Sequence, residues 1–372
     1  MHVRLVDPSA YTPPYDHALA SALARAGARV TLATSEFPYG DVPGPEGYAI
    51  ERRFYRRGRG PAGSLQRRIT KLVSHVPDMR ALGRDARDAD VVHFQWLALQ
   101  QLDGLLLPRG RPVVLTAHDV LPREPRPGQL RAQERLYQRV DAVVVHSHHG
   151  RDRLVGQLDV DPATVHVIPH GAFEHLTAVE RAALPRPLDA VKRPVVLLFG
   201  LVRPYKGLDV LLDAWRRLAA DARGEAPAEL WVVGLPKMDL APLKAQAPSG
   251  VRFVDRFVAD EEAAAFFDRA DVVVLPYREI DQSGVLFTGL AFGKPLVLSD
   301  VGGFPEIAAE GAAELVPAGD APALATALER LLGDRERRRE LGARAGALAR
   351  GPYSWDAVAE AHLELYRALL ER

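Results

Sequence analysis

Short runs of apolar residues alternate with helix-period segments from one end of the chain to the other. The runs lie at 2–6, 29–34, 89–94, 111–118, 141–147 and 164–171, and again at 194–200, 228–234, 251–258, 270–277, 294–300 and 312–317. They are continuous rather than alternating, which is typical of parallel strands covered on both faces. Between them lie amphipathic stretches such as 15–27, ending at Gly27. The pattern predicts an α/β fold with doubly wound sheets.

The alternation breaks once, at residues 181–194, which contain three prolines and no strand pattern. We interpret this segment as a linker between two doubly wound domains, residues 1–182 and 194–352. The C-terminal residues 354–372 form a further predicted helix, with Ser354 as its N-cap. In such folds ligands bind at the carboxyl ends of the strands, so a site in a cleft between the two domains is expected.

Composition narrows the class of protein. The chain has 372 residues, of which 47% are hydrophobic and 26% charged, and its 48 basic residues equal its 48 acidic ones. A dedicated nucleic-acid binder needs a basic excess, so no nucleic-acid partner is expected. Cysteine is absent, which excludes disulfides, a thiolate nucleophile and cysteine-ligated zinc. The N-terminus lacks a signal-peptide pattern and no apolar run reaches a membrane-spanning length, so we expect a cytoplasmic protein.

Two segments carry candidate anion-binding chemistry. In 197–215 a strand ends at Gly200, a loop carries Arg203 and Lys206, and a helix begins around Gly207. Two cations at a strand end suit a diphosphate, although solvated loop cations are the alternative; both side chains are expected at the surface.

The second segment spans residues 281–306. Ser283 and Gly284 stand where a helix begins, and free N–H groups there favour an anion. An ordinary capped helix with Ser283 as N-cap is the alternative, and the two readings are compatible. Gly293 and Pro295 are interpreted as the end of this helix.

Taken in order, "TAHD" (116–119), "VIPHG" (167–171), "FGLVRPYKG" (199–207) and the 276–306 segment resemble a GT-B glycosyltransferase of retaining family 4. The resemblance covers nearly the whole chain. It implies two Rossmann-like domains facing across a cleft, with the last helix, 354–372, crossing back to the N-terminal domain. It also implies that the C-terminal domain holds a nucleotide-diphosphate sugar, with UDP or GDP as the nucleotide. The N-terminal domain would hold the acceptor, and neither a metal nor another cofactor is expected.

The same resemblance assigns residues. It makes His118, Arg203 and Lys206 the catalytic residues, with His118 beside the donor sugar and the two cations on the diphosphate. It assigns substrate binding to Gly234, Arg256, Phe257, Val258, Gln282, Ser283, Gly284, Val285 and Thr288 on the donor side, and to Tyr15 and Asp16 on the acceptor side. Asp16 is equally interpretable as a helix-start residue.

The implied reaction is a retaining, metal-independent transfer to an acceptor hydroxyl on the front face, with the leaving phosphate taking the proton. The chain departs from the family at Ile280 and Thr288, where many members carry glutamates; Glu279 or Asp281 is the stand-in considered for the first. These departures keep two alternatives open: a nucleotide-sugar epimerase, and a catalytically weak nucleotide-sugar-binding subunit. A nicotinamide-dependent dehydrogenase is excluded because no G-x-G-x-x-G follows the first strand.

Residues 52–76 hold eight basic residues and no acidic one. Leu65, Ile69, Leu72, Val73 and Val76 fall on one face of a predicted helix. We favour packing of this face on the N-terminal sheet; peripheral contact with the inner face of a membrane is the alternative. The acceptor class stays open between a glycan, a lipid-linked sugar and a small molecule. The histidines at 146, 148 and 149 are interpreted as structural rather than as metal ligands.

Overall fold

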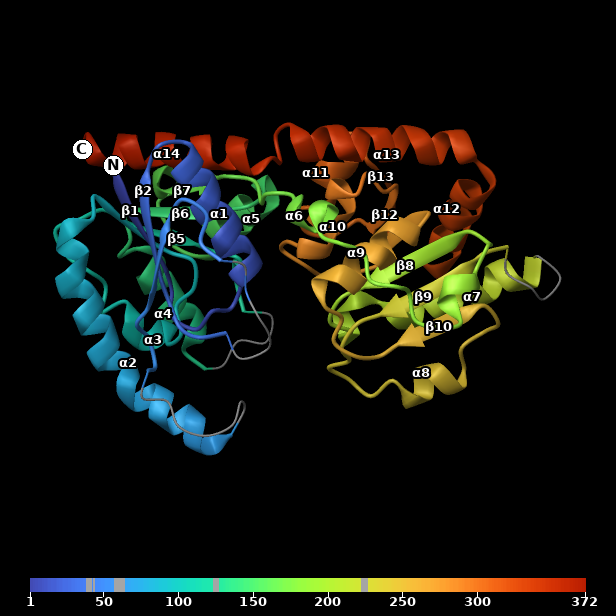
Figure 1. The fold of residues 1–372 in the computed structure, drawn as a ribbon, viewed down its shortest axis with the longest axis horizontal. Coiled ribbons are helices and arrows are strands. Elements are labelled where there is room, and N and C mark those ends of the chain that lie inside the picture. The colour runs from blue at the N-terminus through green and yellow to red at the C-terminus, as the bar shows by residue number, and fades with distance from the viewer. Residues whose placement is uncertain (38–41, 43, 57–63, 123–126, 222–226) are drawn as a thin grey trace. The chain divides into compact units, whose positions relative to one another are not determined.

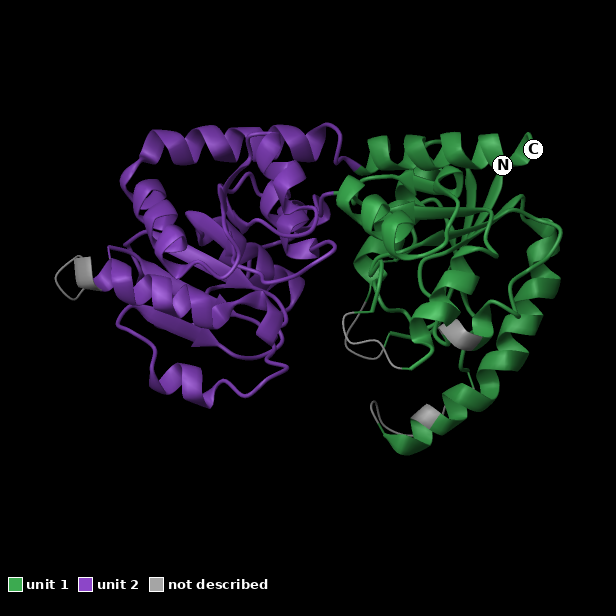
Figure 2. Ribbon diagram, turned by 180° about the vertical axis from the view of Figure 1, so that it is seen from behind, with its two compact units in different colours: residues 1–171, 355–372 green, residues 172–354 purple. Residues whose placement is uncertain are grey.

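The computed structural model describes residues 1–372 apart from 38–41, 43, 57–63, 123–126 and 222–226. Contacts divide the chain into two compact units, Met1–Gly171 with Trp355–Arg372, and Ala172–Ser354 (Figure 2). Residues 172–182, assigned from the sequence to the first domain, lie with the second unit. The reason is local packing: Ala172 belongs to the second unit's core, and the Ala182 N–H donates to the Glu261 carbonyl.

Unit 1 is built on a parallel sheet. Within the described residues it has seven strands in the order β3-β2-β1-β4-β5-β6-β7 (Figure 1). The strands are β1 His2–Asp7, β2 Arg29–Thr34, β3 Ala49–Arg52, β4 Val91–Phe94, β5 Val113–Thr116, β6 Ala142–Val145 and β7 Val165–Val167. All positions of β1, β4, β5 and β6 are buried, as expected for strands with helices on both faces.

The helices of unit 1 cover this sheet. They are α1 Pro13–Arg25, α2 Leu65–Asp85, α3 Gln100–Asp103, α4 Gln129–Tyr137, α5 His148–Gln157 and α14 Trp355–Leu370, with 3₁₀ turns at Ala86–Asp88 and Pro162–Thr164. The last helix, α14, lies against α1, and Arg25 bonds Asp356 between them at 2.7 Å. The C-terminal helix therefore belongs to the unit that begins the chain.

Unit 2 repeats the architecture with a smaller sheet. Its described residues form six parallel strands in the order β10-β9-β8-β11-β12-β13. They are β8 Val195–Phe199, β9 Glu229–Val233, β10 Val251–Val254, β11 Val272–Leu275, β12 Leu296–Ser299 and β13 Ala313–Val316. The register runs straight across the centre, for example from Leu197 in β8 to Trp231 in β9.

The helices of unit 2 form two layers with a core under each. They are α6 His175–Ala178, α7 Leu208–Asp221, α8 Ala241–Ala245, α9 Asp260–Arg269, α10 Gly284–Ala291, α11 Phe304–Ala309, α12 Ala321–Gly333 and α13 Arg335–Arg350, with 3₁₀ turns at Leu188–Ala190 and Pro204–Lys206. One core joins the sheet to α7 and α12, and the other joins it to α9, α10 and α13. Alternate residues of β8 point into the two cores, as the pleat of a strand requires.

Most predicted elements are confirmed, and the differences have simple causes. Gly27 and Gly293 follow helices with φ of 90° and 58°, as their role at helix ends predicted. The strand expected over 251–258 ends at Val254, so the prediction was wrong for its last residues. β3 was missed because two of its four residues are exposed, the other two are only partly buried, and they show no apolar run.

The favoured packing of the 65–76 apolar face on the sheet is wrong. Leu65, Ile69, Leu72 and Val73 are 72%, 53%, 56% and 70% exposed. The second half of α2 is held in the core, and Figure 1 shows the first half extending beyond the sheet of unit 1. Residues 57–63 of this basic segment lie outside the described residues. No described helix is both long enough and apolar enough to cross a membrane.

Candidate functional site

Two glycines shape the strand ends of unit 2 because backbone passes close to each. Gly234, after β9, has a φ of 140°, and a Cβ there would lie 2.0 Å from the Gly200 carbonyl oxygen. Gly207, which precedes α7, has a φ of 67°, and a Cβ there would lie 2.0 Å from the Pro276 carbonyl oxygen. No other residue fits either position without moving backbone. The loops after β8, β9 and β11 are thereby held close together.

Lys206 is buried within this loop cluster. Its side chain is 5% exposed, Nζ donates to the Phe199 carbonyl at 3.1 Å, and Nζ lies 5.1 Å from the centre of the Tyr277 ring. The expectation that Lys206 is a surface residue is therefore wrong. The 3₁₀ turn Pro204–Lys206 directs the side chain back over the end of β8, where a carbonyl and a ring face receive the ammonium. The result is a fixed positive charge at the carboxyl edge of the sheet.

The ammonium of Lys206 and the start of α10 meet at Gly200. A Cβ on Gly200 would lie 3.0 Å from Lys206 Nζ and 3.1 Å from Val285 Cγ2. Ser283 occupies the N-cap position as predicted, yet its side chain forms no capping hydrogen bond. Gly284 and Val285 begin the helix, so their N–H groups have no carbonyl one turn earlier to bond. A cation and a helix N-terminus therefore converge beside a residue without a side chain, an arrangement suited to phosphate.

The other residues assigned to the donor side differ in whether their side chains are exposed and free to bind a ligand. Arg203 is exposed, and its guanidinium makes no hydrogen bond or ion pair with any described residue. Arg256 binds Glu262 through both terminal nitrogens, at 2.8 and 2.5 Å. Phe257 is exposed and Val258 is half-buried, both beyond the end of β10. The segment 256–258 thus offers a ligand the exposed Phe257 ring and its main-chain groups, apart from the Phe257 carbonyl, which accepts from Arg256.

At the two positions where the family often carries glutamates, this chain has an apolar side chain and a hydroxyl that bonds within its own helix. Ile280 is buried in the core of unit 2. Thr288 donates its hydroxyl to the Gly284 carbonyl one turn earlier in α10, at 3.0 Å. Next to Ser283, Gln282 accepts the Ser283 N–H through Oε1 at 3.2 Å. Of the two considered stand-ins, Glu279 is exposed and Asp281 is buried.

In unit 1, His118 lies in a cluster of aromatic rings at the ends of β5, β6 and β7. Trp96 stacks on it at 5.1 Å and 15°, and Tyr15 meets it edge-on at 4.7 Å. His146 and His170 lie beside Tyr15 as well, with ring centres 5.5 and 4.9 Å from it. The structure therefore brings the two predicted residues His118 and Tyr15 into contact.

The hydrogen bonds of the cluster assign the proton on His118. His146 Nδ1 lies 3.0 Å from the Ile168 carbonyl, which only accepts, so Nδ1 must donate. Burial lowers the pKa of His146 to about 4, so the neutral ring offers Nε2 as an acceptor. His118 Nδ1, 3.2 Å away, then donates to it. Burial, and then the neighbouring histidines, lower the pKa of His118 well below its ordinary value, which leaves Nε2 as a bare acceptor.

Nε2 of His118 has no hydrogen-bond partner among the described residues although it is covered. The same is true of the Tyr15 hydroxyl. The interpretation of His146 as merely structural missed its link to His118. A signal was present in the sequence: His118, His146 and His170 each follow the end of a strand, and these three strands are neighbours in the sheet. Carboxyl ends of adjacent parallel strands meet at one edge.

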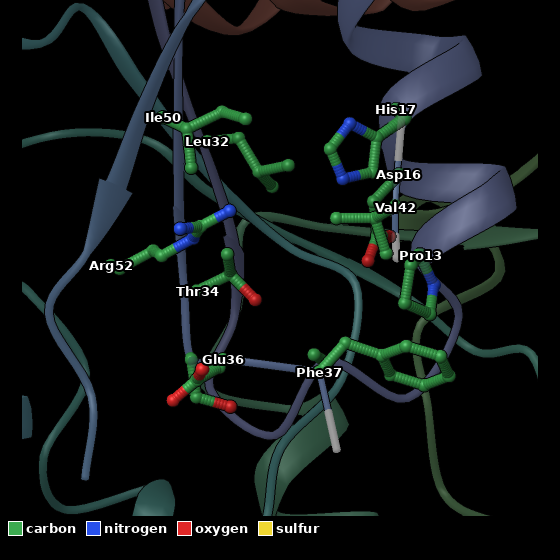
Figure 3. A pocket seen from close by; sticks show the side chains of 12 residues that line it. Pro13, Asp16, His17, Leu32, Thr34, Glu36, Phe37, Val42, Ile50 and Arg52 are labelled. Carbon is green, nitrogen blue, oxygen red and sulfur yellow. The ribbon is translucent and has the colours of Figure 1, made fainter. Parts of the chain in front are cut away.

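A pocket of about 190 Å³ opens between α1 and the strands β2 and β3 (Figure 3). In Figure 3, Asp16 and His17 on α1 face Leu32, Thr34 and Arg52 on the strands. Glu36 lies further along the pocket wall. A pocket lined by carboxyl, imidazole, hydroxyl and guanidinium groups suits a ligand rich in hydroxyls.

Asp16 is a buried and neutral member of a carboxyl pair. Burial, followed by the charge of Asp7, raises the pKa of Asp16 well above its ordinary value. Asp7 is the member that carries the charge, because it accepts the N–H groups of Ser9, Tyr11 and Thr12. Oδ1 of Asp16 has no partner among the described residues. Asp16 stands in the first turn of α1 and is also one of the residues that line the pocket.

Comparisons with known proteins agree with this architecture. Residues 15–172 match the family model Glycosyltransferase Family 4, and residues 193–334 match Glycosyl transferases group 1. The D-inositol 3-phosphate glycosyltransferase of Nocardia farcinica is 31% identical over 76% of this chain and 67% of its own. That of Kineococcus radiotolerans is 30% identical over 66% of this chain. The present chain spans 61% of this second relative, less than two thirds.

Solved structures extend the likeness to the whole fold. Sucrose-phosphate synthase from Thermosynechococcus elongatus is 21% identical, with a TM-score of 0.75 over 100% of this chain and 99% of that one. Anabaena HepE in complex with UDP-glucose is 18% identical, with a TM-score of 0.73 over 99% of this chain and 100% of that one. The expected fold class, GT-B, is confirmed. The chain belongs to the family 4, group 1 glycosyltransferases.

Proposed function

We propose that the chain transfers a sugar from a nucleoside-diphosphate donor to an acceptor hydroxyl, with retention at the anomeric carbon. One observation carries the donor assignment: the Lys206 ammonium and the first turn of α10 converge on Gly200. The charge of Lys206 and the free N–H groups at the start of α10, packed together around Gly200, match the needs of a diphosphate. Arg203, which is exposed and lies three residues before Lys206 in the sequence, is the second cation.

The rest of unit 2 supports a nucleotide on this diphosphate. Gly234 holds the loops after β8 and β9 close together beside this site, and the main chain of 256–258 can bond a base while Arg256 is held by Glu262. UDP and GDP are the candidate nucleotides. The relative HepE has been solved with UDP-glucose, which supports a nucleotide sugar without deciding the base for this chain.

In the proposed reaction the acceptor oxygen bonds the anomeric carbon on the face that the diphosphate leaves. The bond from the anomeric carbon to the diphosphate oxygen breaks, and that oxygen takes the acceptor's proton. Lys206, Arg203 and the N-terminus of α10 stabilise the charge that develops on the diphosphate, so no metal is required. Nε2 of His118 accepts a hydrogen bond from a hydroxyl group of the donor sugar, and the Asp16 pocket holds the acceptor.

The test is turnover of UDP- and GDP-sugars, with D-inositol 3-phosphate, named in the relatives, among the acceptors. Lys206→Met should lower kcat about 100-fold or more, because a charge aimed at the leaving group is lost. Lys192→Met is the matched control, since Lys192 is exposed and precedes β8 at the opposite edge of the sheet. NMR of the product should show a retained anomeric configuration, and EDTA should leave the rate unchanged.

Other outcomes would contradict the proposal. Interconversion of nucleotide sugars without acceptor would indicate an epimerase. Tight nucleotide binding with no turnover of any donor would indicate a binding subunit. An inverted product, or full activity of a folded Lys206→Met variant, would contradict the mechanism.

A further inference from the structure

The first half of α2 presents an apolar face that nothing in the described structure covers. Leu65, Ile69, Leu72 and Val73 recur at helical spacing and are all more than half exposed. The other large exposed apolar side chains described in unit 1 are scattered along the chain: Met1, Tyr11, Leu105, Leu130 and Leu370. Isolated exposed apolar residues are ordinary, but a contiguous stripe indicates an interaction surface.

The helix is rigidly held from its middle onward. Met79 and Leu82 are fully buried in the core of unit 1. His75 bonds Asp103 at 2.5 Å and Tyr55 at 2.9 Å, and both contacts are buried. The exposed turns therefore continue from a helix whose second half is anchored in unit 1.

Two arginines without partners among the described residues, Arg80 and Arg84, follow the apolar stripe along the same side of α2. The helical period places Arg80 and Arg84 on the side of α2 that carries Ile69 and Val73. Both arginines are exposed, and neither forms a hydrogen bond or ion pair with a described residue.

The carboxylates of α2 lie elsewhere and are engaged. Asp78 accepts the Tyr55 N–H at 2.8 Å, and Asp85 pairs with Arg53 at 2.6 Å. No acidic residue stands in the first turn. The stripe with Arg80 and Arg84 is therefore an apolar and cationic surface, without a carboxylate on it to pair with the arginines of a second copy.

We propose that this face of α2 binds the surface of an anionic phospholipid bilayer. The apolar side chains enter the interface while the two arginines meet lipid phosphates, the arrangement of an interfacial amphipathic helix. Because binding to vesicles involves neither donor nor acceptor, the inference is independent of the proposed function.

The test is co-sedimentation of the full chain with vesicles. Wild type should pellet with an equal mixture of phosphatidylglycerol and phosphatidylcholine, and not with phosphatidylcholine alone. Ile69→Ser with Val73→Ser should weaken binding about tenfold or more, because two apolar side chains no longer enter the interface. Arg80→Gln with Arg84→Gln should weaken it several-fold and remove its salt dependence. Leu105→Ser and Arg135→Gln, exposed elsewhere on unit 1, are the controls and should bind as wild type.

All substituted side chains are exposed, so each variant should melt within about 2 °C of wild type. Failure of wild type to pellet with the anionic vesicles would overturn the proposal, as would unchanged binding by the Ile69→Ser, Val73→Ser protein. Sedimentation velocity without lipid gives a further check. A dimer abolished by the same double substitution would make the stripe a self-association surface and would also overturn the proposal.

Discussion

His146 Nε2 lies 3.2 Å from His118 Nδ1, and the Ile168 carbonyl on the far side of His146 fixes which of the two rings donates. His146 is therefore a positioning residue for His118. It holds the ring in the tautomer whose free Nε2 faces away from His146 as an acceptor.

Replacing His146 separates a positioning role from simple packing. In His146→Leu the acceptor for His118 Nδ1–H is lost, and we expect kcat/KM to fall about tenfold, the value of one buried hydrogen bond. In His146→Gln the amide oxygen can still accept, so most activity should return. ¹⁵N NMR should show the Nδ1–H form of His118 in wild type and a mixture of tautomers in His146→Leu. The same tautomer in both proteins would contradict the role.

The buried histidines of unit 1 make its stability depend on pH. Burial lowers the pKa of His146 and His362 to about 4 and of His170 to about 3, from an ordinary value of 6.5. The unfolded chain therefore binds more protons than the folded one between these values. The contribution of these neutral histidines to the free energy of unfolding is complete above pH 6.5. As the pH drops toward 4, the free energy of unfolding falls by up to about 1.4 kcal/mol per pH unit for each histidine.

Hydrogen exchange of the amides in β4 to β7, followed from pH 7 to pH 5 after correction for intrinsic rates, measures this dependence. His146→Gln removes one titrating group and should show a shallower slope. A slope equal to that of wild type would show that His146 does not titrate on unfolding.

Asp7 and Asp16 should respond differently to the same isosteric change. Asp16→Asn replaces a neutral carboxyl by a neutral amide that can still donate to Asp7, so stability at pH 7 should change by less than about 1 kcal/mol. Asp7→Asn replaces the charged acceptor of three N–H groups and should cost about 2 kcal/mol or more. Urea unfolding measures both, and equal losses would contradict the assigned protonation states.

Asp16→Asn should also act on the acceptor. Asp16 lines the pocket in which we propose that the acceptor binds, so the variant should raise the KM for the acceptor while leaving the KM for the donor unchanged. A change confined to the donor KM would place the acceptor elsewhere.

Gly234 should tolerate no side chain. Gly234→Ala would force a Cβ to 2.0 Å from the Gly200 carbonyl at a φ of 140°, so we expect a loss of at least about 2 kcal/mol and weaker nucleotide binding. Gly156→Ala in α5, where nothing lies within 4 Å of the added methyl, is the control and should be neutral or stabilising. Thermal unfolding compares them, and equal melting temperatures would contradict the close approach.

The sequence was sufficient for the parallel sheets because their strands are buried on both faces and read as continuous apolar runs. The strand β3 was not predicted, because this short edge strand of exposed and partly buried residues carries no such run. The apolar face of α2 was predicted, but its exposure was not the favoured interpretation. Helical periodicity shows that a face is apolar and does not show what covers it.

Features of the site that depend on a single residue type could be predicted from the sequence. Features that depend on contacts between several residues could not. Glycines and cations at strand ends can be recognised from order along the chain. The burial of Lys206 depends on how its turn folds back over Phe199 and Tyr277, which spacing does not report. The pairing of Asp7 with Asp16, and of His118 with His146, likewise requires the positions of neighbouring strands and loops.

The most direct test of the central claim is calorimetric titration of the chain with UDP, GDP and ADP, using wild type, Lys206→Met and the control Lys192→Met. A folded state is verified for each by circular dichroism. The account predicts micromolar binding of one nucleotide to wild type and control, and binding weakened about 100-fold or more in Lys206→Met. Equal affinity of Lys206→Met and wild type, or no binding of any of the three nucleotides, would contradict the diphosphate site.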